Sequence, residues 1–192
     1  MITGKSALSS AEEVLRQIEK AAQREFLPIV GPSRGKILVE EVRKAKPRHV
    51  LEVGTLIGYS AILMGKELDE NAEIVTIEIH RDEAKIAGEN VVRANIPPKV
   101  TIITGDAVEV IPTLNGPFEF AFIDAEKSEY LQYLDLAENK FHKGTVVVAD
   151  NAGIFADQMS DYLDYVRNSG EYKSRYVQVG DDGVEISVKL QL

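Results

Sequence analysis

The feature that most constrains this chain is a short apolar run that leads into a glycine-rich turn and then into a helix. The run spans residues 50–53, Gly54 and Gly58 follow it, and the helix begins near Tyr59. An apolar run of this length is typical of a buried parallel strand. The order strand, glycine turn, helix leaves free backbone N–H groups beside a crevice at the carboxyl end of the strand. The pattern favours either a site for a ligand with an adenosine part or a plain tight turn.

The two glycines do not form the pattern of a dinucleotide site. Their spacing is G-x-x-x-G, whereas dinucleotide-binding folds use G-x-G-x-x-G. A nicotinamide-dependent oxidoreductase is therefore disfavoured. Glu52 lies just before the turn, and a carboxylate inside a buried strand needs a partner outside the strand. Glu52 is accordingly a candidate contact for the ligand.

Strand-like and helix-like segments alternate along the chain, which predicts one α/β domain over residues 1–192. We expect a doubly wound, Rossmann-like, mostly parallel seven-stranded sheet with a C-terminal antiparallel hairpin. The hairpin turn is expected at Asp181-Asp182-Gly183. The other strands are expected near 50–53, 72–79, 100–103, 118–123 and 144–149, and the helices near 10–26, 33–46, 58–69, 81–95, 128–140 and 156–169.

The helices within about residues 1–46 have two interpretations: a cap over the crevice, or ordinary flanking helices.

Composition narrows the class of protein further. A net charge of −9 argues against broad binding to nucleic-acid phosphates, and the absence of cysteine excludes thiolate metal sites and thiol nucleophiles. No apolar run approaches a membrane span of roughly 18 residues, and no signal-peptide core is visible, so a soluble cytoplasmic protein is expected.

Acidic and amide side chains follow the predicted parallel strands. An isolated aspartate in such a place is usually a helix N-cap or a turn former. Because the carboxyl ends of parallel strands share one edge of a sheet, these side chains gather on one rim, and gathered carboxylates raise each other's pKa unless cations offset them. The residues concerned are Glu52, Glu78, Asp106, Asp124, Asp150 and Asn151.

Two parts of this rim are candidate binding sites, one for a ribose and one for a metal ion. Glu78 ends the second strand, where a carboxylate commonly accepts hydrogen bonds from a ribose diol, although a solvated strand-end glutamate is an equal alternative. Asp124, Asp150 and Asn151 supply three hard oxygen ligands, which suit Mg²⁺ or another divalent cation. Zinc is disfavoured because the three histidines are scattered.

Several motifs occur in a fixed order from about residue 30 to the C-terminus. They are Glu52-x-Gly54-x-x-x-Gly58-Tyr59-Ser60, Glu78, Gly105-Asp106-Ala107, residues 122–130, residues 143–151 and Asp182-Gly183-Val184-Glu185. In this order they resemble the catechol O-methyltransferase-type family, which includes caffeoyl-CoA O-methyltransferases. These class I enzymes use S-adenosylmethionine and a divalent cation. The resemblance implies the class I methyltransferase fold and transfer of a methyl group to a small aromatic diol.

The resemblance also implies roles for individual residues. Glu78 would hold the ribose hydroxyls, Asp106 and Ala107 would lie at the adenine, and Val30 would line the cofactor. The methionine part would be surrounded by residues at the glycine turn, with Asp124 nearby: Glu52, Gly54, Thr55, Gly58, Tyr59 and Ser60.

For catalysis, the resemblance makes Lys127 the catalytic lysine and makes Asp124, Asp150 and Asn151 the ligands of Mg²⁺. Lys127 and Asn151 would also contact the substrate, and Glu185 would accept a hydrogen bond from a catechol hydroxyl. General-base catalysis by Lys127 fits the need to remove a phenol proton before an in-line methyl transfer.

The chain departs from the family at the substrate pocket. Ala125 and Glu126 stand where catechol O-methyltransferases have a histidine and an aromatic wall, and tryptophan is absent, so the substrate preference stays open.

Two alternatives also remain: methylation of hydroxyuridine in transfer RNA, and a cofactor-binding protein without turnover. A small-molecule partner is expected, membrane binding is not, and a homodimer is left open. A local basic patch for RNA would comprise Lys5, Lys20, Arg24, Arg34 and Lys36.

Overall fold

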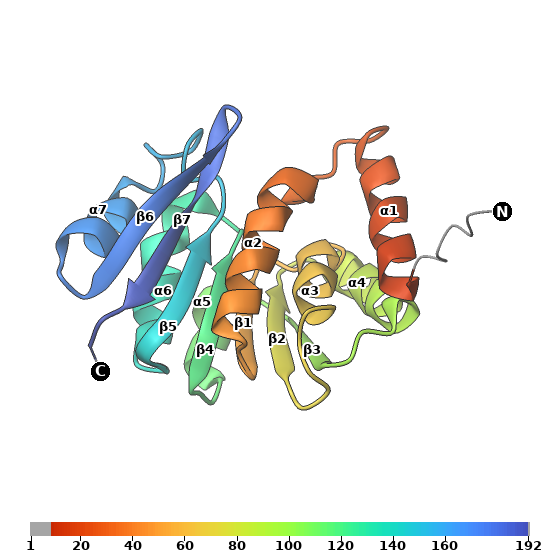
Figure 1. Cartoon of the computed structure of the whole chain (residues 1–192), viewed down its shortest axis with the longest axis horizontal. Helices are drawn as coiled ribbons and strands as arrows, with labels where there is room; N and C mark the ends of the chain where they lie inside the picture. The colour runs from red at the N-terminus through yellow and green to blue at the C-terminus, as the bar shows by residue number, and fades with distance from the viewer. Residues whose placement is uncertain (1–8, 192) are drawn as a thin grey trace, which may run out of the picture.

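A seven-stranded sheet runs through the centre of the molecule, with its strands in the order β3-β2-β1-β4-β5-β7-β6 (Figure 1). The structure is a computed structural model and describes residues 9–191. Strands β1 to β5 are parallel, and β7 runs antiparallel to both β5 and β6. The bounds are β1 His49–Val53, β2 Glu73–Glu78, β3 Lys99–Thr104, β4 Phe118–Ile123, β5 Phe141–Ala149, β6 Tyr172–Val179 and β7 Asp182–Lys189.

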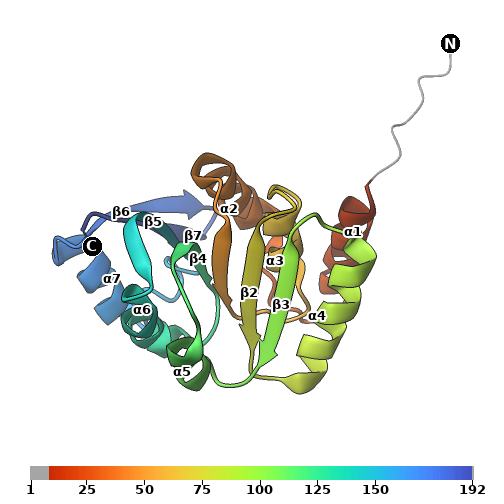
Figure 2. The same cartoon turned by 90° about the horizontal axis from the view of Figure 1, so that it is seen from below.

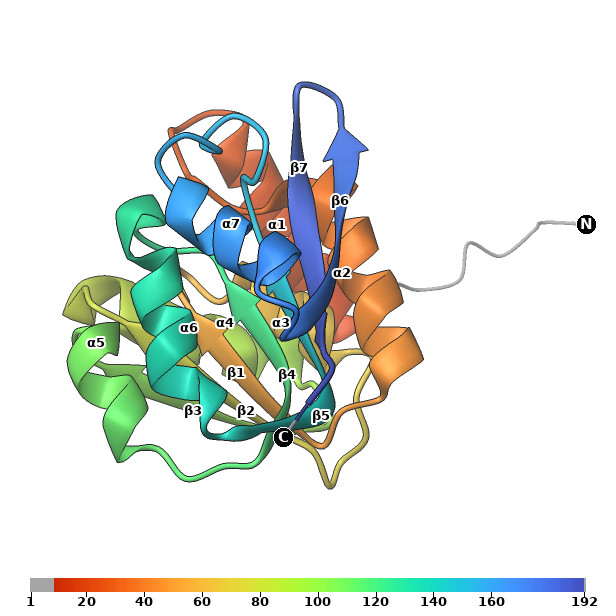
Figure 3. The same ribbon diagram turned by 90° about the vertical axis from the view of Figure 1, so that its left-hand side faces the viewer.

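Helices cover both faces of this sheet (Figures 2 and 3). Because successive residues of a strand point to opposite faces, β1 sends Val50 into one core and Leu51 and Val53 into the other. The first core packs against α1 (Ser10–Ala22), α2 (Gly31–Ala45), α3 (Tyr59–Gly65) and α4 (Arg81–Ala94). The second packs against α5 (Ala107–Val110), η1 (Ile111–Thr113), α6 (Tyr130–Glu138) and α7 (Ser160–Asn168). The expected doubly wound fold with a terminal antiparallel hairpin is confirmed.

The hairpin turn differs from its predicted position. Val179 pairs with Asp182, so the two-residue turn is Gly180-Asp181, and Gly180 takes the positive φ of 62° that the turn requires. Asp182 and Gly183 belong to β7 instead. A side chain at Gly183 would collide with the backbone of Val177. The glycine that looked like a turn former therefore permits a close approach between the two strands.

Other boundaries shift by a few residues. The helix expected near 156–169 begins at Ser160, because residues 151–159 form a series of turns closed by bonds such as Met159 N to Phe155 O at 3.2 Å. Strand β5 begins at Phe141, three residues earlier than the predicted start at Gly144. A capping box begins α1: the Ser9 side chain accepts from Glu12 N, and the Glu12 side chain accepts from Ser9 N.

The N-terminal helices lie on the α3–α4 side of the sheet. Val14, Leu15 and Ile18 of α1 are buried in the first core, and α1 packs on α3 and α4. Lys5, which was expected in a basic patch, lies outside the described residues. Within residues 9–191, no helix combines the length and the apolar character needed to cross a membrane.

Candidate cofactor and metal site

A cleft of about 810 Å³ opens at the carboxyl ends of the central parallel strands. Its walls come from the segment that joins α1 to α2, the glycine turn, and the loops after β2, β3, β4 and β5. Most of the predicted site residues line it: Val30, Gly54, Thr55, Tyr59, Ser60, Glu78, Asp106, Ala107, Asp124, Lys127 and Asn151. Among the N-terminal segments, residues 26–34 close one side of the cleft, whereas α1 flanks the fold.

The glycine turn brings β1 and β4 close together at the floor of the cleft. Gly54 has φ of 99°, and a side chain there would collide with the carbonyl oxygen of Asp124. Its N–H donates to the carbonyl of Ile77 at 3.0 Å. Gly58, with φ of 86°, sits at the N-cap position of α3, behind the residues that line the cleft. Glycine at position 54 is therefore required for the approach of the Asp124 backbone.

Glu78 is held in a fixed orientation at the end of β2. Its two carboxylate oxygens accept from Leu56 N at 2.7 Å and from His80 N at 2.9 Å, and the residue is 5% exposed. Glu83 lies beside it, and burial together with the Glu78 charge raises the pKa of Glu83. His80 and Glu83 also line the cleft, although no sequence pattern marks them as site residues.

Asp106 has a structural role as well as a place in the cleft. Its side chain accepts from Val108 N at 2.8 Å and so caps the short helix α5, which begins at Ala107. Tyr133 of α6 also lines this end of the cleft, and its hydroxyl donates to Glu129. A planar ligand group at this end would therefore meet Ala107 and Tyr133 with carboxylates nearby.

Glu52 is completely buried behind the floor of the cleft and is not one of its lining residues. Its Oε2 accepts from Thr76 Oγ1 at 2.6 Å, and Thr76 Oγ1 lies 2.5 Å from Thr55 Oγ1. The other oxygen, Oε1, has no partner among the described residues. Burial, with smaller contributions from the charges of Asp124 and Glu78, raises the pKa of Glu52 to about 7. Thr55 thus links this buried carboxyl group to the cleft.

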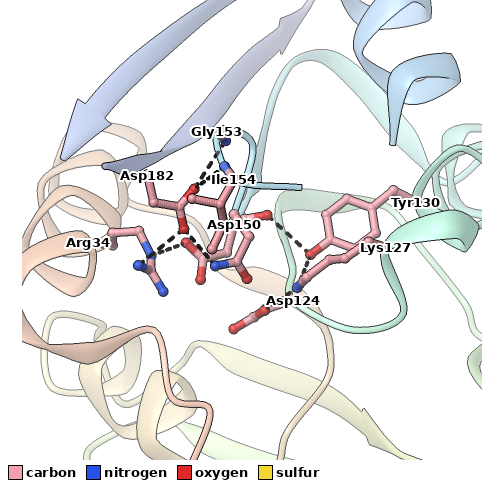
Figure 4. A network of polar contacts seen from close by, with 9 residues as sticks. Arg34, Asp124, Lys127, Tyr130, Asp150, Gly153, Ile154 and Asp182 are labelled. Carbon is pink, nitrogen blue, oxygen red and sulfur yellow. Dashed lines mark hydrogen bonds and ion pairs between the residues drawn. The ribbon is translucent and has the colours of Figure 1, made fainter. Parts of the chain in front are cut away.

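Lys127 joins two groups at the end of β4 (Figure 4). Its Nζ donates to Asp124 Oδ1 at 2.9 Å and to Tyr130 Oη at 2.8 Å. The Tyr130 hydroxyl in turn donates to the carbonyl of Asp150 at 3.3 Å. Lys127 begins η2 (Lys127–Glu129), which leads directly into α6, and its side chain is 14% exposed. Lysine, aspartate and tyrosine therefore form a connected group that faces the cleft.

Asp150 is buried at the end of β5 and is paired with an arginine that the sequence did not assign to the site (Figure 4). Arg34 Nε donates to Asp150 Oδ1 at 2.6 Å, whereas Oδ2 is buried without a partner among the described residues. Burial, followed by the nearby charge of Asp124, raises the pKa of Asp150 to about 7, although Arg34 opposes this shift. Arg34 also forms an ion pair with Asp182. It is therefore not part of an exposed basic patch, contrary to the expectation from the sequence.

These features fit a divalent cation. The charge of Asp124 lies close enough to raise the pKa of Asp150, and Oδ2 of Asp150 is buried without a hydrogen-bond donor among the described residues. The side chain of Asn151, the next residue in the chain, adds an amide oxygen. Hard oxygen donors of this kind suit Mg²⁺.

Glu185 requires a correction. Its fully buried carboxylate accepts from Arg167 Nε at 3.0 Å, from Arg167 Nη2 at 2.6 Å and from Ser174 Oγ at 2.6 Å. It lies on the α7 side of the sheet, away from the cleft. Asp182 precedes it by three residues and so points to the opposite face, toward α2 and Asn151. The hairpin carboxylate next to the site is therefore Asp182.

Comparisons with known proteins find similarity to O-methyltransferases. A family model described as O-methyltransferase matches residues 5–168. Catechol O-methyltransferase B of Danio rerio is 36% identical over 180 residues, which cover 87% of this chain and 67% of that protein. Catechol O-methyltransferase of Niastella koreensis is 38% identical over 126 residues, covering 64% of this chain and 57% of that protein. This chain thus matches only 57–67% of the length of these two relatives.

A solved structure, the O-methyltransferase of Bacillus cereus in complex with S-adenosylhomocysteine, has a TM-score of 0.82 and 28% identity. The match covers 98% of this chain and 93% of that one. The likeness therefore extends over almost the whole fold described above.

Proposed function

This chain belongs to the O-methyltransferase family, and from that membership we propose that it transfers a methyl group from S-adenosylmethionine to a hydroxyl of a small catechol-like aromatic diol. We further propose that a divalent cation, Mg²⁺ or another, takes part. The observation that carries the proposal is that Lys127 and Asp124, which bond to each other, line a cleft that Glu78 also lines, while Tyr130 connects Lys127 to the backbone carbonyl of Asp150. Residues 1–192 would act as one catalytic domain.

S-adenosylmethionine is the proposed methyl donor. The cleft volume of about 810 Å³ is within the range of small-molecule sites. Glu78 is oriented by two backbone donors and retains lone pairs for the hydroxyls of a ribose. The bound S-adenosylhomocysteine of the Bacillus cereus relative supports the same assignment. In the proposed arrangement Asp106 and Ala107 lie at the adenine, and the methionine part lies against Val30 and the glycine turn, with Glu52 reaching it only through Thr55.

Asp124, Asp150 and Asn151 are the proposed ligands of the cation. When bound, the cation would act as a Lewis acid and stabilise the ionised form of the substrate hydroxyl. The partnerless oxygen of Asp150 and the closeness of the Asp124 charge support this assignment. Asn151 would orient a second, neighbouring hydroxyl of the substrate, which favours vicinal diols.

Lys127 is the proposed general base. It is fixed by Asp124 and Tyr130, so its nitrogen has a defined position at the edge of the cleft. From there the neutral form of its amine would take the proton of the attacking hydroxyl and become an ammonium group, a contribution typically worth about 10²- to 10⁴-fold in rate. Holding the two reacting groups in line supplies the remaining advantage.

Apolar side chains at the cleft suit an aromatic ring. Ile154 and Phe155, from the turns after β5, line the cleft next to Asn151, and Phe26 reaches its rim from the α1–α2 segment. Ala125 and Glu126 also line the cleft, where the alanine occupies little space and the glutamate adds a carboxylate. The apolar side chains among these residues favour a small aromatic ring.

The proposal is tested by calorimetric titration of S-adenosylhomocysteine, followed by dihydroxybenzoate with and without MgCl₂. We expect cofactor binding in both conditions and diol binding only with MgCl₂, with a methylated product when S-adenosylmethionine is supplied. Tight cofactor binding with no product from any catechol would instead indicate a cofactor-binding protein without turnover.

A further inference from the structure

The carboxylate of Asp182 is surrounded by four N–H donors, although the proposed function gives this residue no role. Its Oδ2 accepts from Asn151 Nδ2 at 2.7 Å and lies 3.3 Å from Arg34 Nη1, and its Oδ1 accepts from the N–H groups of Gly153 and Ile154, both at 3.1 Å (Figure 4). The residue is 5% exposed. All four of these contacts come from N–H donors, two on each oxygen, so the carboxylate acts as an acceptor at both oxygens and its acceptor sites are filled.

A carboxylate whose two oxygens both meet N–H donors accepts these hydrogen bonds and donates none. The part of the Asn151 amide that faces Asp182 must therefore be its NH₂ group, and the amide oxygen is turned away from Asp182. Asn151 also has a φ of 60°, a left-handed conformation, and the N–H groups of Gly153 and Ile154 in the same loop bind the same carboxylate. Asp182 consequently decides which atom of Asn151 is available to a ligand.

Arg34 has the corresponding effect on Asp150. Its Nε donates to Oδ1 of Asp150 at 2.6 Å and its Nη1 faces Asp182, so one guanidinium group contacts both carboxylates. The other oxygen of Asp150 is left without a donor. Three segments that are far apart in the chain therefore meet here: the first turns of α2, the loop after β5 and the first residue of β7.

We propose that Asp182 and Arg34 are positioning residues that present one oxygen each of Asn151 and Asp150 to the divalent cation. The proposal rests on the proposed function, because it assumes that these two residues bind a cation. Groups behind the ligands of a metal commonly fix their orientation in this way. Asp182 itself is not a ligand, since its oxygens are already occupied by four donors.

The test is an Asp182→Asn variant, with Asp181→Asn as the matched control. The two substitutions make the same chemical change at adjacent positions, but Asp181 is exposed in the hairpin turn. At position 182 an amide keeps one oxygen for Gly153 and Ile154 and turns its NH₂ toward Asn151. The Asn151 amide must then reverse and point its own NH₂ at the cation. An amide NH₂ group cannot act as a metal ligand. We expect Mg²⁺ affinity, measured by calorimetry, to fall about 10- to 100-fold.

The double variant Asn151→Asp, Asp182→Asn separates positioning from general damage. The new amide at 182 donates to the new carboxylate at 151, which again presents an oxygen, and the total charge is unchanged. We expect Mg²⁺ affinity within a few-fold of the parent, and S-adenosylhomocysteine affinity unchanged in all variants. A folded double variant that binds Mg²⁺ as weakly as the single one, or a single variant that binds as well as the parent, would overturn the proposal.

A measurement on the unaltered protein covers the case in which the variants do not fold. In crystals grown with MnCl₂ we expect manganese beside the side-chain oxygen of Asn151, with its NH₂ still on Asp182. Manganese bonded by Asp182 itself would contradict the proposal. A parent protein that binds neither Mg²⁺ nor Mn²⁺ would instead refute the proposed cation requirement, so the two failures are distinguishable.

Discussion

The ε-amino nitrogen of Lys127 lies 2.9 Å from Oδ1 of Asp124, three residues earlier in the chain. The same nitrogen donates to the Tyr130 hydroxyl at 2.8 Å, three residues later. Both partners are fixed by main-chain structure, because Asp124 directly follows β4 and Tyr130 begins α6. Lys127 therefore has little freedom to leave the wall of the cleft.

This placement predicts the effect of replacing Lys127. Lys127→Met keeps the length of the side chain but removes the base, so we expect kcat for catechol methylation to fall about 10²- to 10⁴-fold. S-adenosylhomocysteine affinity should stay within a few-fold of the parent. Lys143→Met, at an exposed position before the buried part of β5, is the control and should have normal activity. Normal kcat in the Lys127 variant would remove this residue from the mechanism.

A second prediction concerns the ribose site. Glu78→Ala should weaken S-adenosylhomocysteine binding by about 1–3 kcal/mol, because the ribose hydroxyls lose a charged acceptor and the N–H groups of Leu56 and His80 lose theirs. Calorimetry measures the change. Glu89→Ala, exposed on α4, should have no effect. Equal affinities for the parent and the Glu78 variant would show that the ribose is held elsewhere.

The fold and the rim of the cleft could be predicted from local patterns. Apolar runs, glycine turns and the alternation of strands and helices identify β1 to β5, and residues that follow parallel strands must share one edge. Asp124, Asp150 and Glu78 were found in this way because their positions depend only on strand ends.

The residues that were missed depend on long-range geometry. Arg34 lies 116 positions before Asp150 in the chain, and no local pattern connects the two. Misplacing the hairpin turn concealed the role of Asp182, and resemblance alone assigned Glu185 to the substrate although it points to the other face of β7. The register of an edge hairpin decides such assignments, because a shift of one residue reverses every side chain.

The corrected position of Glu185 gives a prediction about stability. Glu185→Gln should lower the free energy of unfolding by about 1–3 kcal/mol, because the buried carboxylate loses its ion pair with Arg167, which is itself partly exposed. Denaturant unfolding measures the loss, and Glu40→Gln, exposed on α2, is the control. The ratio of methylated products should not change. An altered product ratio at unchanged stability would return Glu185 to the substrate site.

Glu52 predicts how stability depends on pH. Its pKa of about 7 in the folded protein exceeds its ordinary value of 4.5, so the folded state keeps a proton that the unfolded chain loses between these pH values. The free energy of unfolding should therefore fall as the pH rises from about 4.5 to about 7, by roughly 3 kcal/mol from this group.

Glu52→Gln should remove that contribution. We expect the difference in unfolding free energy between pH 5 and pH 8, measured without ligands, to be smaller in this variant than in the parent. The Glu40→Gln control should retain the parent's pH dependence. A Glu52 variant with the parent's pH dependence would mean that Glu52 is ionised throughout this range.

We propose that this chain methylates a catechol with S-adenosylmethionine and requires a divalent cation held by Asp124, Asp150 and Asn151. The most direct measurement is the rate of product formation from dihydroxybenzoate after treatment with EDTA, and again after MgCl₂ is added in excess. We predict no methylated product in EDTA, full recovery with Mg²⁺, and no recovery in Asp150→Ala at the same Mg²⁺ concentration. Full activity in EDTA, with metal analysis showing no bound cation, would contradict the account.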